Sequence, residues 1–167
     1  MIKSRLEEHA KRFAITWHGD QKYGDKPYIV HLEAVREVLL QFGVAYESPL
    51  GIAAWLHDVL EDTEAPPWDI EYAFSSYVLS LVEAVTGRGA NRRERVKNKL
   101  EKIAAYAPAA PLALADRIVN VEKSKAHRLD LFEMYRREQI AFEHALLAHI
   151  HIEPNVSMLK RLQGAFL

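Results

Sequence analysis

The amino-acid sequence predicts an all-α fold. Apolar residues recur at helical spacing along nearly the whole chain, and no segment shows the strict alternation of a half-buried strand. Proline or glycine marks most of the breaks between these segments, as expected where helices begin and end. With 167 residues, 49% of them hydrophobic and 27% charged, the chain is long enough for one globular domain with its own core. We therefore expect a single helical domain over residues 1–167.

Each expected helix follows from an apolar stripe and a stop signal. A first helix over residues 3–18 is followed by the loop HGDQKYGDK, which contains two glycines. Pro27 lies at the start of a second helix, about 28–42, where its missing N–H costs nothing, and Gly43 ends that helix. Pro49 opens a central helix. The remaining expected helices cover residues 67–87 (two short helices with a break near Ser75), 91–107, 111–126, 129–151 and a short segment after Pro154.

The composition excludes several classes of function. The formal net charge is −1, so we expect no general attraction to nucleic acid or to an anionic membrane. The chain has no cysteine, which excludes disulfides, thiol catalysis and cysteine-ligated zinc and is compatible with a reducing compartment. The N-terminal residues are charged throughout, without an apolar signal segment, and no run reaches the length of a membrane span. We therefore expect a cytoplasmic protein.

The central helix ends in a group of polar residues. His57 and Asp58 directly follow an apolar run, and Glu61 and Asp62 come one helical turn later. An unpaired carboxylate that enters a buried helix costs on the order of several kcal/mol, so Asp58 should be protonated, paired or bound to metal. This segment is the candidate active site.

Two further polar residues lie where the apolar pattern predicts burial. His31 points inward with the apolar stripe of the second helix, and Asp116 directly follows the apolar run LALA. With His57 and Asp58 they form a set of two imidazoles and two carboxylates, which suits manganese, iron or zinc with positions left for water. Any one of them alone is better explained as a hydrogen-bonded core histidine or a buried salt-bridge acceptor. Their joint occurrence favours a metal site.

Three stretches carry a resemblance to a known family: GDKPYIVHLEAV (24–35), AAWLHDVLEDT (53–63) and LALADRIVN (112–120). In order and spacing they resemble the motifs of the HD-domain metal-dependent phosphohydrolases. The resemblance is greatest to the hydrolase domain of the RelA/SpoT guanosine polyphosphate enzymes and their short stand-alone homologues. It covers about residues 10–125, and residues 129–167 match only as helices. It implies that one metal ion, usually manganese, is bound by the residues that correspond to His31, His57, Asp58 and Asp116.

The family's Glu-Asp pair falls on Glu61 and Asp62. In metal-dependent hydrolysis the metal makes water a nucleophile near neutral pH, and a nearby carboxylate can orient that water or take its proton. The second carboxylate can protonate the leaving group. Asp62 and Thr63 could instead cap the helix that follows the prolines, but capping does not explain Glu61. The resemblance implies catalytic roles for both carboxylates.

The resemblance also implies substrate-binding residues. The family's asparagine one turn beyond the last metal-binding aspartate falls on Asn120, and its nucleotide-contacting loop includes residues 21–23. Lys22, Tyr23 and Asn120 are therefore the candidates. The family usually has an Arg-Lys pair in this loop and often an arginine two residues after the asparagine, where this chain has Glu122. Both differences remove positive charge from the substrate site and leave the exact substrate open.

Basic residues follow one side of the expected helix at 91–107. Such a stripe can bind phosphate, but more often it is solvated surface whose aliphatic stems cover apolar neighbours. Because the net charge gives phosphate binding no support, we expect a solvated face. The residues of this stripe are Arg92, Arg95, Lys99 and Lys102.

These observations predict a manganese-dependent phosphohydrolase, with iron or zinc as alternative metals, that acts on a nucleotide or small phosphate ester. By resemblance, the reaction is removal of the 3′-pyrophosphate from guanosine tetra- or pentaphosphate (ppGpp and pppGpp) by metal-activated water. Two alternatives stand beside it: an HD phosphohydrolase for another nucleotide or phosphate ester, and a non-catalytic nucleotide-binding regulatory module. The sequence leaves open whether the chain forms a homo-oligomer.

Overall fold

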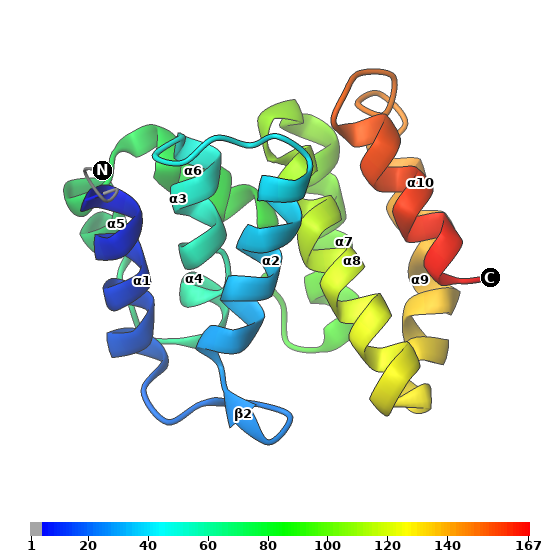
Figure 1. Ribbon diagram of the computed structural model, residues 1–167, viewed down its shortest axis with the longest axis horizontal. Helices are drawn as coiled ribbons and strands as arrows, with labels where there is room; N and C mark the ends of the chain where they lie inside the picture. Colours follow the sequence, from blue (N-terminus) through cyan, green and yellow to red (C-terminus); the bar gives the residue numbers. More distant parts are fainter. Residues whose placement is uncertain (1–4) are drawn as a thin grey trace.

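Helices make up most of the structure, which confirms the predicted fold class. The structure is a computed structural model that describes residues 5–167, so the first two residues of the expected first helix lie outside the described residues. The helices stand side by side, with α1 and α5 at one end of the molecule and α9 and α10 at the other (Figure 1). In chain order the elements are α1 (Arg5–His18), β1 (Lys22–Tyr23), β2 (Lys26–Pro27), α2 (Ile29–Gln41), α3 (Pro49–Leu56), α4 (Val59–Asp62), α5 (Pro67–Ala73), α6 (Ser76–Val85), α7 (Arg92–Ala105), the 3-10 helix η1 (Ala107–Ala109), α8 (Ala110–His127), α9 (Leu129–Leu146) and α10 (Asn155–Ala165).

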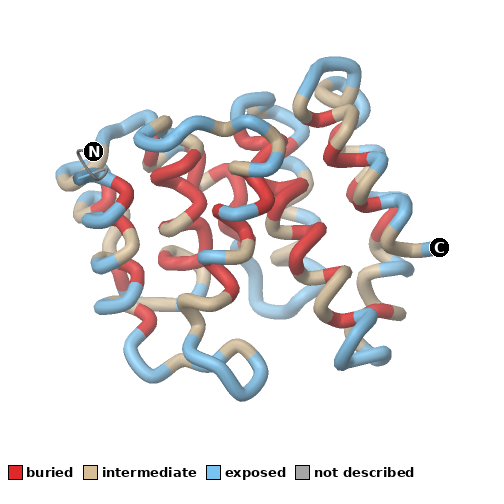
Figure 2. Tube along the Cα trace, in the orientation of Figure 1, coloured by how far each residue is buried: buried red, intermediate tan, exposed pale blue. Residues whose placement is uncertain are grey.

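Helix α8 lies near the centre of this arrangement and packs against α2, α9 and α10. Pro111 lies in its first turn, where a missing N–H costs nothing. The residues that follow are buried on every side, as expected for a helix surrounded by others. Buried positions continue through α2, α3 and α8 and leave the loops exposed (Figure 2). The core therefore surrounds the helix that carries Asp116.

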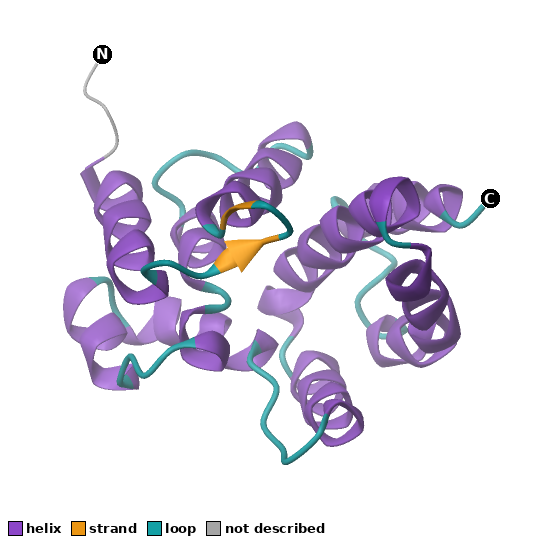
Figure 3. Ribbon diagram, turned by 90° about the horizontal axis from the view of Figure 1, so that it is seen from below, coloured by secondary structure: helices purple, strands orange, loops and turns teal. Residues whose placement is uncertain are grey.

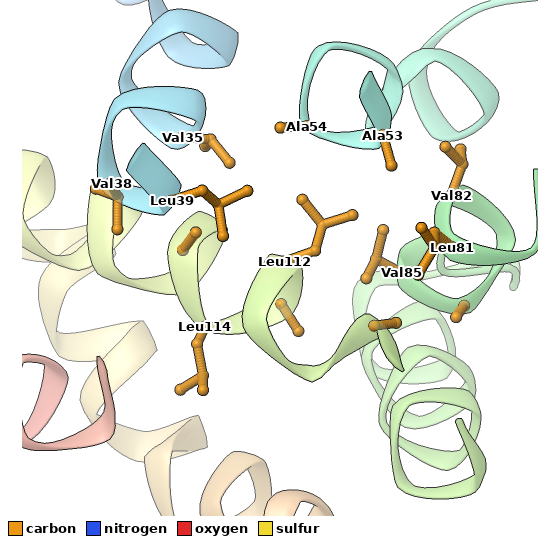
Figure 4. Close-up of a cluster of buried hydrophobic side chains, with 14 of the residues drawn as sticks. Val35, Val38, Leu39, Ala53, Ala54, Leu81, Val82, Val85, Leu112 and Leu114 are labelled. Atoms are coloured by element: carbon orange, nitrogen blue, oxygen red, sulfur yellow. The ribbon is translucent and has the colours of Figure 1, made fainter. Parts of the chain in front are cut away.

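The side chain of Leu112 packs α8 against three neighbouring helices. Its side chain lies among those of Leu39 from α2, Ala53 from α3 and Val85 from α6, whereas Leu114 points away from that group (Figure 4). All five side chains are buried, and Leu112 and Leu114 have no exposed surface. The two faces of α8 thus pack against different parts of the core.

A buried ion pair fastens α1 to the helices beside it. Arg36 of α2 donates from Nε and Nη2 to the two carboxylate oxygens of Glu7 in α1, at 2.9 and 2.8 Å. Trp55 of α3 donates to the same carboxylate at 3.2 Å. The bidentate geometry restricts both side chains more than a single contact would. It therefore fixes α1, and the turn that leaves it, relative to α2 and α3.

Two helix boundaries differ from the expected elements, and two short strands were not expected. The central helix is interrupted at His57 and Asp58, which form a turn between α3 and α4. The expected helix at 129–151 ends at Leu146. Two short antiparallel strands, which the sequence did not reveal, pair Lys22 with Pro27 and Tyr23 with Lys26. Strands of two residues are too short to produce an alternating pattern, so periodicity cannot detect them. Seen from below, this hairpin lies between the two groups of helices (Figure 3).

Leu112→Ala should lower the free energy of unfolding by about 2–5 kcal/mol, because it removes a fully buried side chain from the centre of the core. Leu129→Ala is the matched control, since Leu129 is 69% exposed at the start of α9. We expect the control to change stability by less than about 0.5 kcal/mol. Urea denaturation of the two variants and the wild type measures the difference, and equal losses in both variants would contradict this account of the core.

Candidate active site

The two histidines and two aspartates of the predicted metal site lie together. His31 comes from α2, His57 and Asp58 come from the turn between α3 and α4, and Asp116 comes from α8. One possible ligand atom from each residue lies within 4.8 Å of the other three. Nε2 of His31 lies 3.3 Å from Nε2 of His57 and 3.2 Å from Oδ1 of Asp116. Nε2 of His57 lies 3.1 Å from Oδ2 of Asp58.

The break after α3 places two consecutive side chains in this cluster. In a continuous helix, neighbouring residues point about 100° apart. Asp58 instead has φ −101° and ψ −5°, which departs from regular helical geometry. Nδ1 of His57 lies 2.8 Å from the carbonyl oxygen of Ala54, and a carbonyl can only accept, so Nδ1 donates. This contact turns Nε2 of His57 toward the other ligands.

Charges inside the cluster shift the pKa values of all four groups. Burial alone would lower the pKa of His31 and of His57, but the two aspartates outweigh it and raise both. Burial alone would raise the pKa of Asp58 and of Asp116, yet their contacts with the imidazoles lower both. Without a metal, these shifts favour protons on the imidazole side of the cluster and ionised carboxylates. Protons held there supply the positive charge that the buried carboxylates require.

The arrangement fits a divalent cation. Two imidazole nitrogens that face one another at 3.3 Å can share only one proton in a hydrogen bond, whereas a cation between them satisfies both. Outer residues orient the carboxylates. The hydroxyl of Tyr28 donates to Oδ2 of Asp58 at 2.7 Å, and Nδ2 of Asn120 donates to Oδ1 of Asp116 at 2.6 Å. Such outer hydrogen bonds are typical of metal sites.

The two predicted catalytic carboxylates lie beside the cluster and have separate partners. Oε2 of Glu61 accepts from the backbone N–H of Gly87 at 3.1 Å and lies 3.2 Å from Nζ of Lys99. Oδ2 of Asp62 accepts from Nε2 of Gln21 at 2.8 Å. Helix α5, which follows the prolines, begins without a side-chain cap, so capping does not explain Asp62.

A cavity of about 250 Å³ brings these groups together with the basic helix α7. His31, Asp58 and Asp116 line it along with Glu61 and Asp62, and α7 contributes Arg92, Arg95 and Lys99.

The expectation that this stripe is a solvated face is wrong for Lys99, whereas Arg92 is exposed, as expected, with its side chain 47% accessible. The Lys99 side chain is only 25% exposed, and although burial lowers its pKa, the surrounding carboxylates raise it to about 12. The apolar residues Val96, Leu100 and Ile103 pack α7 inward, and the basic residues beside them reach the cavity.

The three predicted substrate-binding residues do not all lie together. Tyr23 donates from its hydroxyl to Oδ1 of Asn120 at 3.0 Å, which joins the hairpin to α8. Lys22 is exposed and lines neither this cavity nor a second, open one of about 1020 Å³. Tyr23 lines the second cavity with Lys123, whose Nζ lies 3.4 Å from the centre of the Tyr23 ring. Asn120 and Tyr135 line both cavities and mark where the two meet.

Sequence reasoning missed three residues that act on the site. Tyr28 was assigned to the apolar stripe of α2, although a buried hydroxyl requires a partner and could have indicated the contact with Asp58. Gln21 and Lys99 gave no such signal, because their contacts depend on the tertiary structure. The turn before the hairpin brings Gln21 to Asp62, and the rotation of α7 brings Lys99 to Glu61. No helix among residues 5–167 is both long enough and apolar enough to cross a bilayer.

The fold and the buried His/Asp cluster define a helical metal-site protein of the HD type. The HD domain family model matches residues 10–141, and the chain belongs to this family.

Several relatives carry a named activity. A guanosine-3′,5′-bis(diphosphate) 3′-pyrophosphohydrolase from Aquifex aeolicus is 36% identical over 152 residues, which is 85% of this chain and 21% of that protein. The chain thus spans about a fifth of that relative's length. MESH1 of Drosophila melanogaster, also named a guanosine-3′,5′-bis(diphosphate) 3′-pyrophosphohydrolase, is 30% identical over 133 residues, 77% of this chain and 74% of MESH1.

A solved structure shares the fold. It is reported as "A metazoan ortholog of SpoT hydrolyzes ppGpp and plays a role in starvation responses". Its TM-score is 0.82, with 99% of this chain and 96% of that chain covered at 23% sequence identity. At that identity the match supports the helical architecture.

Divalent metal should bind the cluster and release protons. With Mn²⁺ as the probe, the melting temperature of the wild type and of the exposed control Asp130→Asn should rise, whereas that of Asp116→Asn should not. Because the imidazoles hold protons that a metal must displace, the apparent affinity should fall as the pH falls. Calorimetric titrations in two buffers with different ionisation enthalpies measure the released protons. Heats that do not depend on the buffer, or unchanged affinity in Asp116→Asn, would contradict this assignment.

Proposed function

We propose that this chain is a manganese-dependent phosphohydrolase that removes the 3′-pyrophosphate from ppGpp or pppGpp. The observation that carries the proposal is one cavity lined by three residues of the four-residue His/Asp cluster, two further carboxylates and three basic side chains. That combination provides for metal binding, proton transfer and phosphate binding in one place. The named activity of the Aquifex relative and of MESH1 supports the choice of substrate.

A bound divalent metal supplies a Lewis acid for the phosphoryl group and lowers the pKa of water. His31, His57, Asp58 and Asp116 hold it, and Tyr28 keeps the Asp58 carboxylate in position.

Glu61 and Asp62 move the protons. Oε2 of Glu61 is engaged with Lys99 and with the N–H of Gly87, and Oδ2 of Asp62 is engaged with Gln21. We assign proton transfer to the other oxygen of each carboxylate. One takes the proton of the attacking water, and the other returns a proton to the leaving oxygen.

The basic wall of α7 binds the charge that develops on the pyrophosphate. Arg92, Arg95 and Lys99 line the cavity on the side of α7, where Arg92 is paired with Glu138 and Lys99 with Glu61. Donors that are already in place at the developing charge stabilise the transition state most. The second cavity is adjacent and can hold the nucleoside, with the aromatic ring of Tyr23 and the ammonium group of Lys123 along it.

A second candidate is an HD phosphohydrolase for another nucleotide. It is favoured by one observation at the second cavity. Glu122 stands where the related enzymes often have an arginine, and both of its oxygens accept from Arg161 of α10, at 2.8 and 3.0 Å. An ion pair presents a different surface to the nucleoside than an isolated arginine does, which can alter the base or phosphate pattern that is accepted.

Product analysis tests the proposal. With Mn²⁺ and ppGpp, the wild type should release GDP and pyrophosphate, and Asp58→Ala should lose at least about 100-fold in rate, because it removes a metal ligand. Chromatography over a panel that includes pppGpp, GTP and nucleoside monophosphates identifies the substrate. Hydrolysis of another panel member alone supports the second candidate. Metal and nucleotide binding without any turnover would support a non-catalytic module.

Lys99→Met should lower kcat/KM for the hydrolysed nucleotide by about 10- to 100-fold. It removes a charge that lines the cavity and leaves Glu61 without its cationic partner. Lys97→Met is the matched control, since Lys97 lies two residues away on the same helix, is 78% exposed and pairs only loosely with Glu101 at 3.9 Å. Steady-state kinetics of both variants measures the contrast. Equal effects would show that general surface charge, rather than the cavity wall, assists the reaction.

A further inference from the structure

Asp62 accepts a hydrogen bond from a residue outside the active-site cavity, and that residue is itself held by another side chain. Gln21, in the turn after α1, donates from Nε2 to Oδ2 of Asp62 at 2.8 Å. Oε1 of the same amide lies 2.8 Å from Nδ1 of His18. Asp62 is an exposed residue, so its carboxylate would otherwise sample several rotamers. The two hydrogen bonds restrict it to one direction.

The backbone of Gln21 is hydrogen-bonded through both its N–H and its carbonyl group. Its N–H donates to the carbonyl oxygen of His18 at 3.0 Å, and its own carbonyl oxygen accepts from the N–H of Tyr28 at 3.1 Å. His18 is 7% exposed, and its ring stacks on that of Tyr28 at 4.5 Å with an angle of 25°. The Gln21 side chain therefore extends from a hydrogen-bonded backbone and contacts the buried ring of His18.

The hydrogen-bonding chemistry assigns the proton on His18. A carboxylate can only accept, so the end of Gln21 that faces Asp62 is the NH₂ group. The oxygen of the amide then faces His18 and must accept, so Nδ1 of His18 carries a proton. Nε2 of His18 is buried and has no partner among the described residues, and a buried N–H without a partner is costly. The hydrogen bonds therefore place the proton of His18 on Nδ1.

His18 also supports the metal cluster by a second route. The Tyr28 ring on which it stacks donates from its hydroxyl to Asp58. The buried imidazole of His18 thus supports two side chains. Tyr28 donates to the proposed metal ligand Asp58, and Gln21 donates to the proposed catalytic carboxylate of Asp62.

We propose that Gln21 and His18 are positioning residues that set the direction of the Asp62 carboxylate for proton transfer. The inference rests on the proposed function, because it concerns a carboxylate of the same site. Neither residue lines the active-site cavity. Gln21 acts through Asp62, and His18 acts through Gln21.

Kinetics of matched variants test this role. Gln21→Met, which keeps the length of the side chain but loses both hydrogen bonds, should lower kcat by about 10- to 100-fold and change KM by less than about threefold. In an Asp62→Ala background the same substitution should have no further effect, because the group through which it acts is gone. His18→Asn keeps an N–H donor toward Gln21 and should retain most of the activity, whereas His18→Leu should behave like Gln21→Met.

Gln163→Met serves as the surface control, since Gln163 is exposed, donates to Glu143 and does not line the active-site cavity. Melting temperatures show whether each variant is folded. A purely structural role predicts instead that Gln21→Met lowers kcat by the same factor with or without Asp62, and that His18→Asn and His18→Leu are equivalent. Either result would overturn the proposal.

A second measurement does not depend on turnover. In an ¹⁵N-detected spectrum of the imidazoles, wild-type His18 should show a proton on Nδ1 and none on Nε2. Asp62→Ala should shift the His18 Nδ1 resonance, because Gln21 loses its acceptor and its amide is free to rotate. A protonated Nε2 of His18 would overturn the inference even if the chain hydrolyses ppGpp. So would a His18 Nδ1 resonance that is the same in the wild type and in Asp62→Ala. If the chain hydrolyses no nucleotide but the spectrum changes as expected, the proposed function fails and the arrangement around Asp62 stands.

Discussion

The structure depends on one constraint: two imidazoles and two carboxylates must meet within 4.8 Å inside an apolar core. Each of these groups is costly to bury alone, and together they are stable only with protons or a cation between them. Three parts of the chain are shaped to satisfy this requirement. α2 and α8 cross beside the turn that carries His57 and Asp58, and that turn interrupts what would otherwise be one helix. The pair of Arg36 and Glu7 keeps α1 in place against the same helices.

Charge changes sign across the active-site cavity. The cluster and the carboxylates of Glu61 and Asp62 form an acidic side, and α7 contributes a basic side. Lys99 joins the two through its ion pair with Glu61. A phosphate ester is itself anionic at the phosphate and needs cations on more than one side, so a metal on one side and α7 on the other would enclose it. The same geometry explains why the net charge of the whole chain carried no information about phosphate binding.

The sequence revealed the residues whose chemistry conflicts with their surroundings, and it missed those whose role depends on packing. His31, His57, Asp58 and Asp116 were recognisable because each interrupts an apolar pattern, and the structure does bring them together. The reach of Arg92 and Lys99 into the cavity depends on how α7 rotates against its neighbours, which periodicity describes only to within one face of the helix. Lys22 was chosen for its charge, but in a two-residue strand adjacent side chains point to opposite faces, and Tyr23 is the one that turns inward.

The hydrogen bond between Tyr23 and Asn120 joins residues 97 positions apart in the chain. The four residues of the His/Asp cluster are nearly as widely spread, from His31 to Asp116. Contacts of such long range form only after the intervening chain has been ordered, so they are absent from early, locally structured states. A metal ion that binds this cluster would consequently find little to bind before the fold closes, and it would stabilise the finished domain without guiding its assembly. During synthesis, the chain remains unable to form its site until α8 has left the ribosome.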